Sequence, residues 1–376
     1  MPKKILIVAG EPSGDMHASN LVRDLKALKP DLEFFGLGGE LSRSSGVDII
    51  FDISKLALVG AVEVIKNIFT VKKAYEKIID KINKDRPDLA ILVDYPGFNL
   101  RLARELKRRS IPVVYYISPQ IWAWGKDRVH IIKACVKKIL VFFKFEEDLY
   151  KKHNIDAEFV GHPLLDSVKV TQAKEDVRKK YNFLKDTVVA LLPGSRESEV
   201  NTLLPIMVSA CRIISNKMPD VKFIVVKHPG LPINLYEKAL KEPFLNLKLS
   251  NGEAYNILNA SDFAIVASGT ATLECAIVGT PLAITYKVNI ITYILYKIVS
   301  RIRFLGLANI LAGKEVAPEL LQNNATGKKI AAKTLEILAD EKRRLAIRED
   351  LKKITLSLGL PGASIRAARS INQLLD

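Results

Sequence analysis

The sequence predicts an α/β protein built from two doubly wound domains, each with a parallel sheet. Short apolar runs alternate with amphipathic helical stretches from one end of the chain to the other. Most of these runs are continuously apolar rather than alternating, which is typical of parallel strands covered by helices on both faces. The length of 376 residues is too great for one ordinary domain and suits two.

Each element follows from its local pattern. Apolar runs predict strands at residues 5–10, 89–94, 113–118, 138–143, 188–193, 223–229, 263–268 and 282–285. Amphipathic stretches predict helices at residues 15–29, 61–84, 97–109, 197–217 and 269–279. The strand series restarts after Gly161, His162 and Pro163, so we expect domains at residues 1–165 and 166–346. Their ligands should bind beyond the carboxyl ends of the strands, in a cleft between the domains.

The last segment, residues 347–376, is largely helical and amphipathic, with a break at residues 359–362 (GLPG). We expect it to pack back on the N-terminal domain or on the partner subunit of a homodimer.

Composition narrows the class of protein. The three cysteines lie far apart, which argues against a disulfide framework or a zinc site and favours a reducing cytoplasm. The five histidines lack metal-ligand spacing, so no metal is expected. The net charge of +16 suits nucleic acid, anionic lipid or a phosphorylated ligand. Aromatic residues do not interleave with the basic ones, so nucleic acid is not expected. No uncharged apolar stretch is long enough to span a bilayer.

Two segments have the pattern of phosphate-binding turns. In residues 191–200 (LLPGSRESEV) an apolar strand leads into Gly194, Ser195 and Arg196 and then into an acidic helix start. Backbone N–H groups, the positive end of the helix dipole and a guanidinium would meet there, as an anion site requires. The second segment, residues 267–279 (ASGTATLECAIVG), again follows an apolar run. Two such turns in one half of the chain indicate a nucleoside diphosphate ligand.

The first strand leads into residues 9–15 (AGEPSGD). The simple interpretation is a glycine turn with Asp15 capping the next helix, and it leaves Glu11 and Ser13 unexplained. The strand at residues 89–94 ends in Asp94, which has two interpretations of about equal weight. Asp94 is either a partly desolvated general base or the cap of a helix that starts near Asn99.

Residues 115–128 (YYISPQIWAWGKDR) contain both tryptophans of the chain, Trp122 and Trp124, beside two basic residues. Such a loop suits the stacking of a sugar or acyl group, and equally a helix that packs two indoles on the sheet.

Residues 53–69 and 289–307 are apolar with flanking or interspersed Lys and Arg. That pattern is typical of an interfacial helix or an acyl-chain groove near anionic lipid, and also of a core helix with snorkelling bases. The interfacial interpretation makes Leu58, Val62 and Ile65 lipid contacts.

Several segments together resemble the lipid-A-disaccharide synthase family. They lie in the same order along residues 5 to 322: AGEPSGD (9–15), DYPGFN (94–99), YYISPQIWAW (115–124), VGHPLLD (160–166), LLPGSRESEV (191–200), SGTATLECA (268–276), PLAITYK (281–287) and NILAGKEVAPELLQ (309–322). The resemblance implies a GT-B architecture of two Rossmann-like domains facing a cleft, with the acceptor bound by the first domain and the UDP-sugar donor by the second.

The resemblance also implies the reaction. A UDP-dependent enzyme would transfer 2,3-diacylglucosamine from UDP to the 6-hydroxyl of 2,3-diacylglucosamine 1-phosphate with inversion. The product would be the β-1′,6-linked precursor of lipid A, made in the cytoplasm at the inner membrane of a Gram-negative cell. No metal or other cofactor is implied, and UDP is a product.

Residue roles follow from the resemblance and the chemistry. Asp94 would be the base, with Glu11 or His17 as second choices, and Ser13 would bind the acceptor or the leaving phosphate. Glu274 would accept the ribose hydroxyls. His17, Trp122 and Trp124 would contact acceptor or lipid. The expected donor contacts are Gly194, Ser195, Arg196, Ser268, Gly269, Thr270, Ala271, Glu274, Asn309 and Gln322.

Two other functions remain open from the sequence. One is a different GT-B enzyme of UDP-N-acetylglucosamine, either an undecaprenyl-linked transferase or a 2-epimerase. The other is a non-enzymatic basic protein, against which the two phosphate turns stand because a charge-only binder has no use for them.

Overall fold

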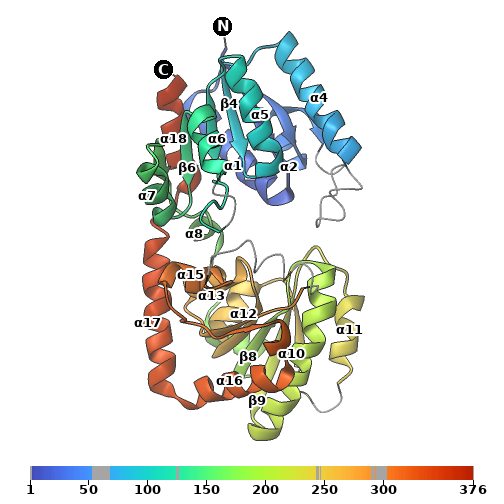
Figure 1. Ribbon diagram of the computed structural model, residues 1–376. Coiled ribbons are helices and arrows are strands. Elements are labelled where there is room, and N and C mark those ends of the chain that lie inside the picture. Colours follow the sequence, from blue (N-terminus) through green and yellow to red (C-terminus); the bar gives the residue numbers. More distant parts are fainter. Residues whose placement is uncertain are drawn as a thin grey trace. The chain divides into compact units, whose positions relative to one another are not determined.

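The computed structural model describes residues 2–52, 68–123, 127–242, 245, 247–288, 293 and 303–375. The chain forms two compact units, the first made of Met1–Pro163 with Leu358–Asp376 and the second of Leu164–Ser357. Both ends of the chain therefore belong to unit 1 (Figure 1). The fold class is the predicted one, with two parallel-sheet α/β units. Of the described residues, no helix is both long and apolar enough to cross a bilayer.

Unit 1 contains a seven-stranded sheet in the order β3-β2-β1-β4-β5-β6-β7, with every neighbouring pair parallel. Its strands are β1 (Lys4–Ala9), β2 (Glu33–Gly38), β3 (Val47–Asp52), β4 (Leu89–Val93), β5 (Val113–Tyr116), β6 (Lys138–Val141) and β7 (Ala157–Phe159). Its helices are α1 (Pro12–Leu28), α2 (Glu40–Ser44), α4 (Ile68–Lys84), α5 (Pro96–Arg108), α6 (Arg128–Cys135), α7 (Lys144–Lys152) and α18 (Ala363–Leu375).

Unit 2 contains a six-stranded parallel sheet in the order β10-β9-β8-β11-β12-β13. Its strands are β8 (Thr187–Leu192), β9 (Val221–Lys227), β10 (Leu247–Asn251), β11 (Phe263–Ala267), β12 (Leu282–Tyr286) and β13 (Glu319–Leu321). Its helices are α8 (Leu164–Ser167), α9 (Lys174–Lys180), α10 (Glu197–Lys217), α11 (Asn234–Leu240), α12 (Ala254–Ala260), α13 (Ala271–Val278), α15 (Leu307–Ala312), the 3₁₀ turn η2 (Gln322–Asn324), α16 (Gly327–Ala339) and α17 (Glu341–Ser357).

All eight predicted strands are confirmed within a few residues, and the structure adds β2, β3, β7, β10 and β13. Four of these five are the edge strands of the two sheets. An edge strand is only partly buried, so its sequence lacks the continuous apolar run that marks a central strand. The fifth, β2, is central, but Gly36 and Gly38 interrupt its apolar pattern.

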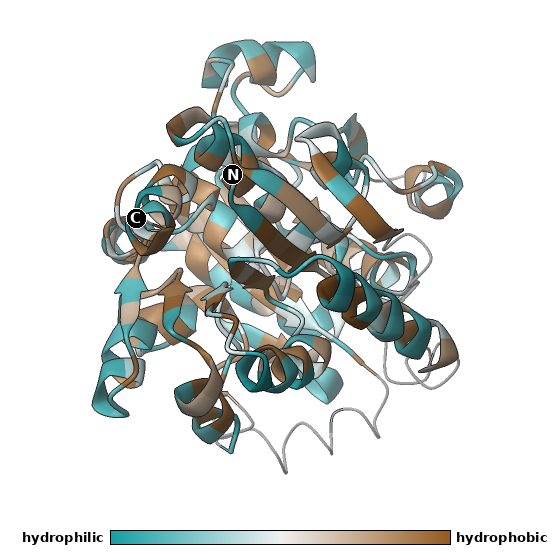
Figure 2. Ribbon diagram, turned by 90° about the horizontal axis from the view of Figure 1, so that it is seen from above, coloured by the Kyte–Doolittle hydropathy of each residue, from teal (hydrophilic) through white to brown (hydrophobic). Residues whose placement is uncertain are grey.

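The central strands of both sheets are buried along almost their whole length, as continuous apolar runs require. Figure 2 shows strands coloured as hydrophobic. In unit 1 one of the two core layers packs α1 and α18 against the sheet, with Leu21, Leu25, Ala367 and Ile371 fully buried. The segment expected as one tail, residues 347–376, is divided between the units. Its first part, up to Ser357, belongs to α17 in unit 2, and α18 packs on α1 in unit 1.

Asp15 does not cap α1, contrary to the sequence-based expectation. The helix starts earlier, at Pro12, so Asp15 lies inside its first turn. Its carboxylate instead accepts hydrogen bonds from the backbone N–H groups of Gly39 (2.7 Å), Leu41 (3.1 Å) and Ser42 (3.2 Å). Asp15 therefore caps α2 and connects the turn after β1 to the turn after β2.

We expect Asp15→Ala to lower the free energy of unfolding by about 2–3 kcal/mol, because three buried or partly buried N–H groups lose their acceptor. Chemical denaturation followed by circular dichroism measures this loss. Asp24→Ala, on the same helix, is the matched control. Equal stability of the two variants would contradict the capping role.

Candidate active site

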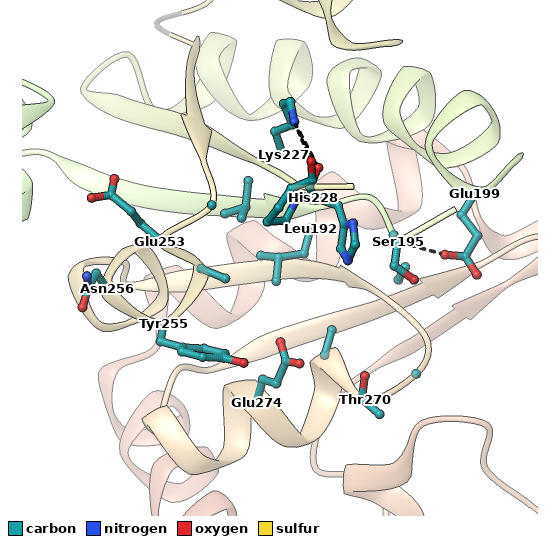
Figure 3. Close-up of a pocket in the computed structure, with 18 of the residues that line it drawn as sticks. Leu192, Ser195, Glu199, Lys227, His228, Glu253, Tyr255, Asn256, Thr270 and Glu274 are labelled. Atoms are coloured by element: carbon teal, nitrogen blue, oxygen red, sulfur yellow. Dashed lines mark hydrogen bonds between the residues drawn. The ribbon is translucent and has the colours of Figure 1, made fainter. Parts of the chain in front are cut away.

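The predicted phosphate turns follow β8 and β11, which lie side by side in the sheet of unit 2. This is the point where the strand order reverses, and ligands of doubly wound sheets bind beyond the strand ends there. A cavity of about 840 Å³ opens at this edge (Figure 3). Eight of the ten predicted donor residues line it: Gly194, Ser195, Arg196, Ser268, Gly269, Thr270, Ala271 and Glu274.

The first turn is occupied by a carboxylate of the chain itself. One oxygen of Glu199 accepts the Ser195 N–H at 3.0 Å, and the other pairs with the Arg196 guanidinium at 3.0 Å (Figure 3 shows the first bond). Gly194 has φ of 125°. A Cβ built there would lie 2.4 Å from the Glu199 oxygen that accepts the Ser195 N–H, so only glycine fits under the carboxylate. The turn thus holds an anion in the geometry predicted for a phosphate.

Glu274 and Tyr255 point toward one another across the cavity (Figure 3). Burial raises the pKa of Glu274 above its usual value. Burial also raises the pKa of Tyr255, and the charge of Glu274 adds to that rise. A half-buried carboxylate that lines a cavity can accept hydrogen bonds from hydroxyl groups of a ligand.

Several lining residues were missed by the sequence analysis, among them Lys227, His228, Glu253 and Asn256. Lys227 is only 8% exposed, and its ammonium donates to the carbonyl of His228 at 3.2 Å. Their positions in the sequence could have identified two of them. Lys227 ends the apolar strand β9, and Glu253 follows β10, so both lie at the same sheet edge as the predicted turns.

Asn309 and Gln322 are not among the residues that line this cavity. The Asn309 amide is fully buried and makes four hydrogen bonds, to Ala317 O, Glu319 and the N–H groups of Val316 and Ala317. Glu319 in turn accepts the N–H groups of residues 305 and 306, beside Ser268 of the cavity.

Gln322 is also buried, with φ of 52°. In the amide orientation that satisfies both groups, its side chain pairs with the backbone N–H and C=O of Val288. Both amides therefore hold loops that follow β12, and neither lines the cavity.

In unit 1 the structure brings Glu11 and Asp94 together. They follow β1 and β4, which are neighbours at the reversal point of that sheet. The ring of Tyr95 lies so close over Gly10 that a Cβ there would be 2.1 Å from it. Burial raises the pKa of Asp94 to about 6, and the charge of Glu11 adds to the rise, while a hydrogen bond from the Tyr95 backbone opposes it.

The alternative role of Asp94 as a helix cap is not observed. Helix α5 starts at Pro96, its N-cap residue is Tyr95, and no side chain caps it. Asp94 and Tyr95 both have φ of 47°, a left-handed conformation that costs free energy in residues with a Cβ. The backbone of Asp94 is held by three contacts: its N–H donates to Tyr116 O, and its carbonyl accepts from Asn99 and Tyr115.

The other predicted residues of unit 1 are spread around this point. Ser13 is exposed in the first turn of α1. His17 packs edge-on against Phe142 at 5.4 Å between ring centroids, and burial lowers its pKa to about 4. A neutral imidazole with that pKa is a weaker base than Asp94.

Trp122 is anchored rather than free. Its indole N–H donates to Glu146 at 3.0 Å, and its ring packs edge-on against Phe145. Trp124, Leu58, Val62 and Ile65 lie outside the described residues, as do most of residues 53–69 and 289–307. Within the described part of the chain, no three His, Cys, Asp or Glu side chains come together in a way that could hold a metal ion.

The fold is that of GT-B glycosyltransferases and their relatives. It is similar to the glycotransferase of kitacinnamycin (TM-score 0.66, 14% identity, all of both chains). It is also similar to UDP-N-acetylglucosamine 2-epimerase from Neisseria meningitidis (TM-score 0.64, 12% identity, 98% of this chain and 100% of the other). At these identities the likeness shows the fold alone.

Sequence comparison identifies the family. The sequence model of the lipid-A-disaccharide synthetase family matches residues 5–371. Lipid-A-disaccharide synthase of Syntrophus aciditrophicus (strain SB) is 43% identical over 97% of this chain and 96% of its own. The enzyme of Myxococcus xanthus (strain DK1622) is 38% identical over 100% and 98%. The chain therefore belongs to the lipid-A-disaccharide synthetase family, and the predicted UDP-sugar glycosyltransferase of lipid A biosynthesis is confirmed.

The charge of Glu11 helps to raise the pKa of Asp94, so we expect Glu11→Gln to lower that pKa toward its usual value. If Asp94 must be ionised for activity, the pH profile of kcat/KM in the wild type has an acid limb with a midpoint near pH 6. The rise in Glu11→Gln should then occur at lower pH.

The measurement is kcat/KM against pH for both proteins, with Asp24→Asn as a charge-matched control on α1. An unchanged acid limb in Glu11→Gln would show that the two carboxylates do not interact.

Proposed function

We propose that this enzyme transfers 2,3-diacylglucosamine from UDP to the 6-hydroxyl of 2,3-diacylglucosamine 1-phosphate. The products are UDP and the β-1′,6-linked disaccharide, with inversion at the donor anomeric carbon. The observation that carries the proposal is the family match along nearly the whole chain. The reaction needs a general base and a site that binds the leaving diphosphate. The candidates at the strand ends are a carboxylate with a raised pKa in unit 1 and an anion-binding turn in unit 2.

Unit 2 binds the donor in this proposal. The Ser195 N–H, the Arg196 guanidinium and the start of α10 bind the diphosphate and stabilise the charge that develops on it as the bond to the sugar breaks. Residues 268–271, at the second turn, also bind the diphosphate. Glu274 accepts hydrogen bonds from the ribose hydroxyls. Asn309 and Gln322 act indirectly, by holding the segments that follow β12.

Unit 1 supplies the base. Asp94 accepts the proton of the acceptor 6-hydroxyl while that oxygen forms a bond to the anomeric carbon. The bond from the carbon to the diphosphate oxygen breaks, and UDP leaves with its electron pair. A base with a pKa near 6 is ionised at neutral pH and remains basic enough to assist. Glu11 raises that basicity, and Ser13 and His17 lie on the adjoining helix as acceptor contacts.

The setting of the reaction is part of the proposal. The substrates are diacylated, and the enzyme has a net charge of +16. Both properties suit an enzyme that binds peripherally, from the cytoplasm, to an anionic inner membrane. Leu58, Val62, Ile65, Trp122 and Trp124 are the proposed lipid contacts. The diphosphate is bound by N–H groups and cations, so we expect the reaction to need no metal. The enzyme acts as a monomer or a homodimer.

The test is UDP release by the purified enzyme with UDP-2,3-diacylglucosamine, in the presence and absence of 2,3-diacylglucosamine 1-phosphate. We expect acceptor-dependent release with a lipid disaccharide detected by mass spectrometry. Asp94→Asn should lower kcat/KM about 100- to 10,000-fold, because an amide cannot accept the proton. Release without acceptor would instead indicate hydrolysis or epimerase-like chemistry.

Glu199 gives a separate test of the donor site. Its carboxylate occupies the N–H and guanidinium assigned to the diphosphate, so we expect Glu199→Gln to bind UDP about tenfold more tightly in calorimetry. Glu197→Gln is the matched control, because it removes a charge from the same exposed helix start. Weaker UDP binding by Glu199→Gln would mean that Glu199 orients Arg196 rather than competing for it.

A further inference from the structure

A buried carboxylate in unit 1 has no part in the proposed chemistry. Glu146 lies in the first turn of α7 and is 3% exposed. One of its oxygens accepts two hydrogen bonds, from the Ser118 hydroxyl at 2.9 Å and from the Trp122 indole N–H at 3.0 Å. Both donors lie in the aromatic loop, residues 117–123, which follows β5. Burying a carboxylate costs free energy unless hydrogen bonds compensate it, so these two donors stabilise Glu146 in this position.

The rest of α7 also holds the aromatic loop. The Tyr150 hydroxyl donates to Pro119 O at 2.9 Å, and the Phe145 ring packs against that of Trp122 with 5.4 Å between centroids. Ile117, at the start of the loop, has φ of 67°, so the loop is held in a conformation that a free chain rarely adopts. Glu146 supplies two contacts, one near each end of the loop, at Ser118 and Trp122.

The aromatic loop is directly continuous with the groups that hold Asp94. It follows Tyr115 and Tyr116, whose hydroxyl and carbonyl respectively bind the backbone of Asp94 at 2.7 and 3.0 Å. The loop therefore begins directly after the two residues that support the backbone of the proposed base. No residue outside unit 1 is needed for this connection.

We propose that Glu146 is a positioning residue, which fixes the aromatic loop through Ser118 and Trp122 and so sets the acceptor side of the reaction. The inference rests on the proposed function for its catalytic consequence. The anchoring itself stands on the contacts of Glu146, and it can be measured without any substrate.

The anchor also makes the loop sensitive to pH. Burial raises the pKa of Glu146 to about 7, although Ser118, Trp122 and backbone N–H groups oppose the rise. An ionised carboxylate accepts hydrogen bonds more strongly than the neutral acid. The loop should therefore be held more tightly as pH rises through about 7.

The neighbouring titratable groups do not change charge in that range. Tyr150, on the same helix, has a pKa raised by burial, and His162, which packs on Phe143, has a pKa lowered to about 4. Lys144 pairs with Glu147, and Arg128, whose charge acts on Tyr150, begins α6. Burial lowers the pKa of His17, which packs on Phe142, to about 4 as well.

The first experiment reads the loop itself. In a Trp124→Phe background, Trp122 is the only tryptophan, because the chain has two. We expect its emission and acrylamide quenching to change with a midpoint near pH 7 in this protein and to be level with pH in the same background carrying Glu146→Gln. Glu147→Gln is the matched control on the same helix and should keep the transition. A transition that persists in Glu146→Gln would overturn the assignment.

The second experiment reads catalysis in the otherwise native enzyme. Glu146→Ala removes both contacts and should raise KM for the acceptor or lower kcat by about 10- to 100-fold, while the Kd for UDP stays within twofold. Glu146→Gln can still accept both bonds and should recover most of the loss, with an acceptor KM that no longer varies with pH near 7.

The outcomes separate the two proposals. Equal losses in acceptor KM and UDP affinity, together with a lower melting temperature in both variants, would mean a merely structural role. If the wild type makes no disaccharide, the proposed function fails, and the fluorescence experiment still decides whether Glu146 anchors the loop.

Discussion

The structure depends on one topological constraint, the reversal of winding in each parallel sheet. In unit 1 the strand order reverses between β1 and β4, and in unit 2 between β8 and β11. Helices that leave two such neighbours go to opposite faces, so the turns at their carboxyl ends are not covered by a helix. Each candidate site has one turn from each strand of the pair: Glu11 with Asp94 in unit 1, and residues 194–196 with residues 268–271 in unit 2.

The strain at the end of β4 shows how this constraint is met. Two consecutive left-handed residues, Asp94 and Tyr95, cost on the order of 1–3 kcal/mol each. Three hydrogen bonds to the backbone of Asp94, from or to Asn99, Tyr115 and Tyr116, offset part of that cost. The packing of the Tyr95 ring over Gly10 offsets a further part of this cost. The result is a carboxylate that is close enough to feel the charge of Glu11 and does not cap α5.

The sequence was sufficient for features that depend on local pattern. Central strands are buried on both faces, so their apolar runs predicted eight strands correctly, and the turns after β8 and β11 predicted one side of the cavity in unit 2. Edge strands were missed because half-burial leaves no continuous run. Features that depend on distant contacts were also missed. Asp15 caps α2 instead of its own helix, and Lys227 and Glu253 join the cavity only through sheet order.

The candidate site in unit 1 disfavours a negative charge, whereas the site in unit 2 favours one. The chemistry of sugar transfer gives a reason for this difference. In unit 1 the pKa of Asp94 is raised by burial and by a like charge, so the free energy of the site favours taking up a proton. In unit 2 the Ser195 N–H and the Arg196 guanidinium favour a negative charge strongly enough to hold Glu199. A transfer in which a hydroxyl loses a proton and a diphosphate gains charge needs both tendencies. Different residues supply the two tendencies, because a cation placed directly beside Asp94 would lower the pKa of that base.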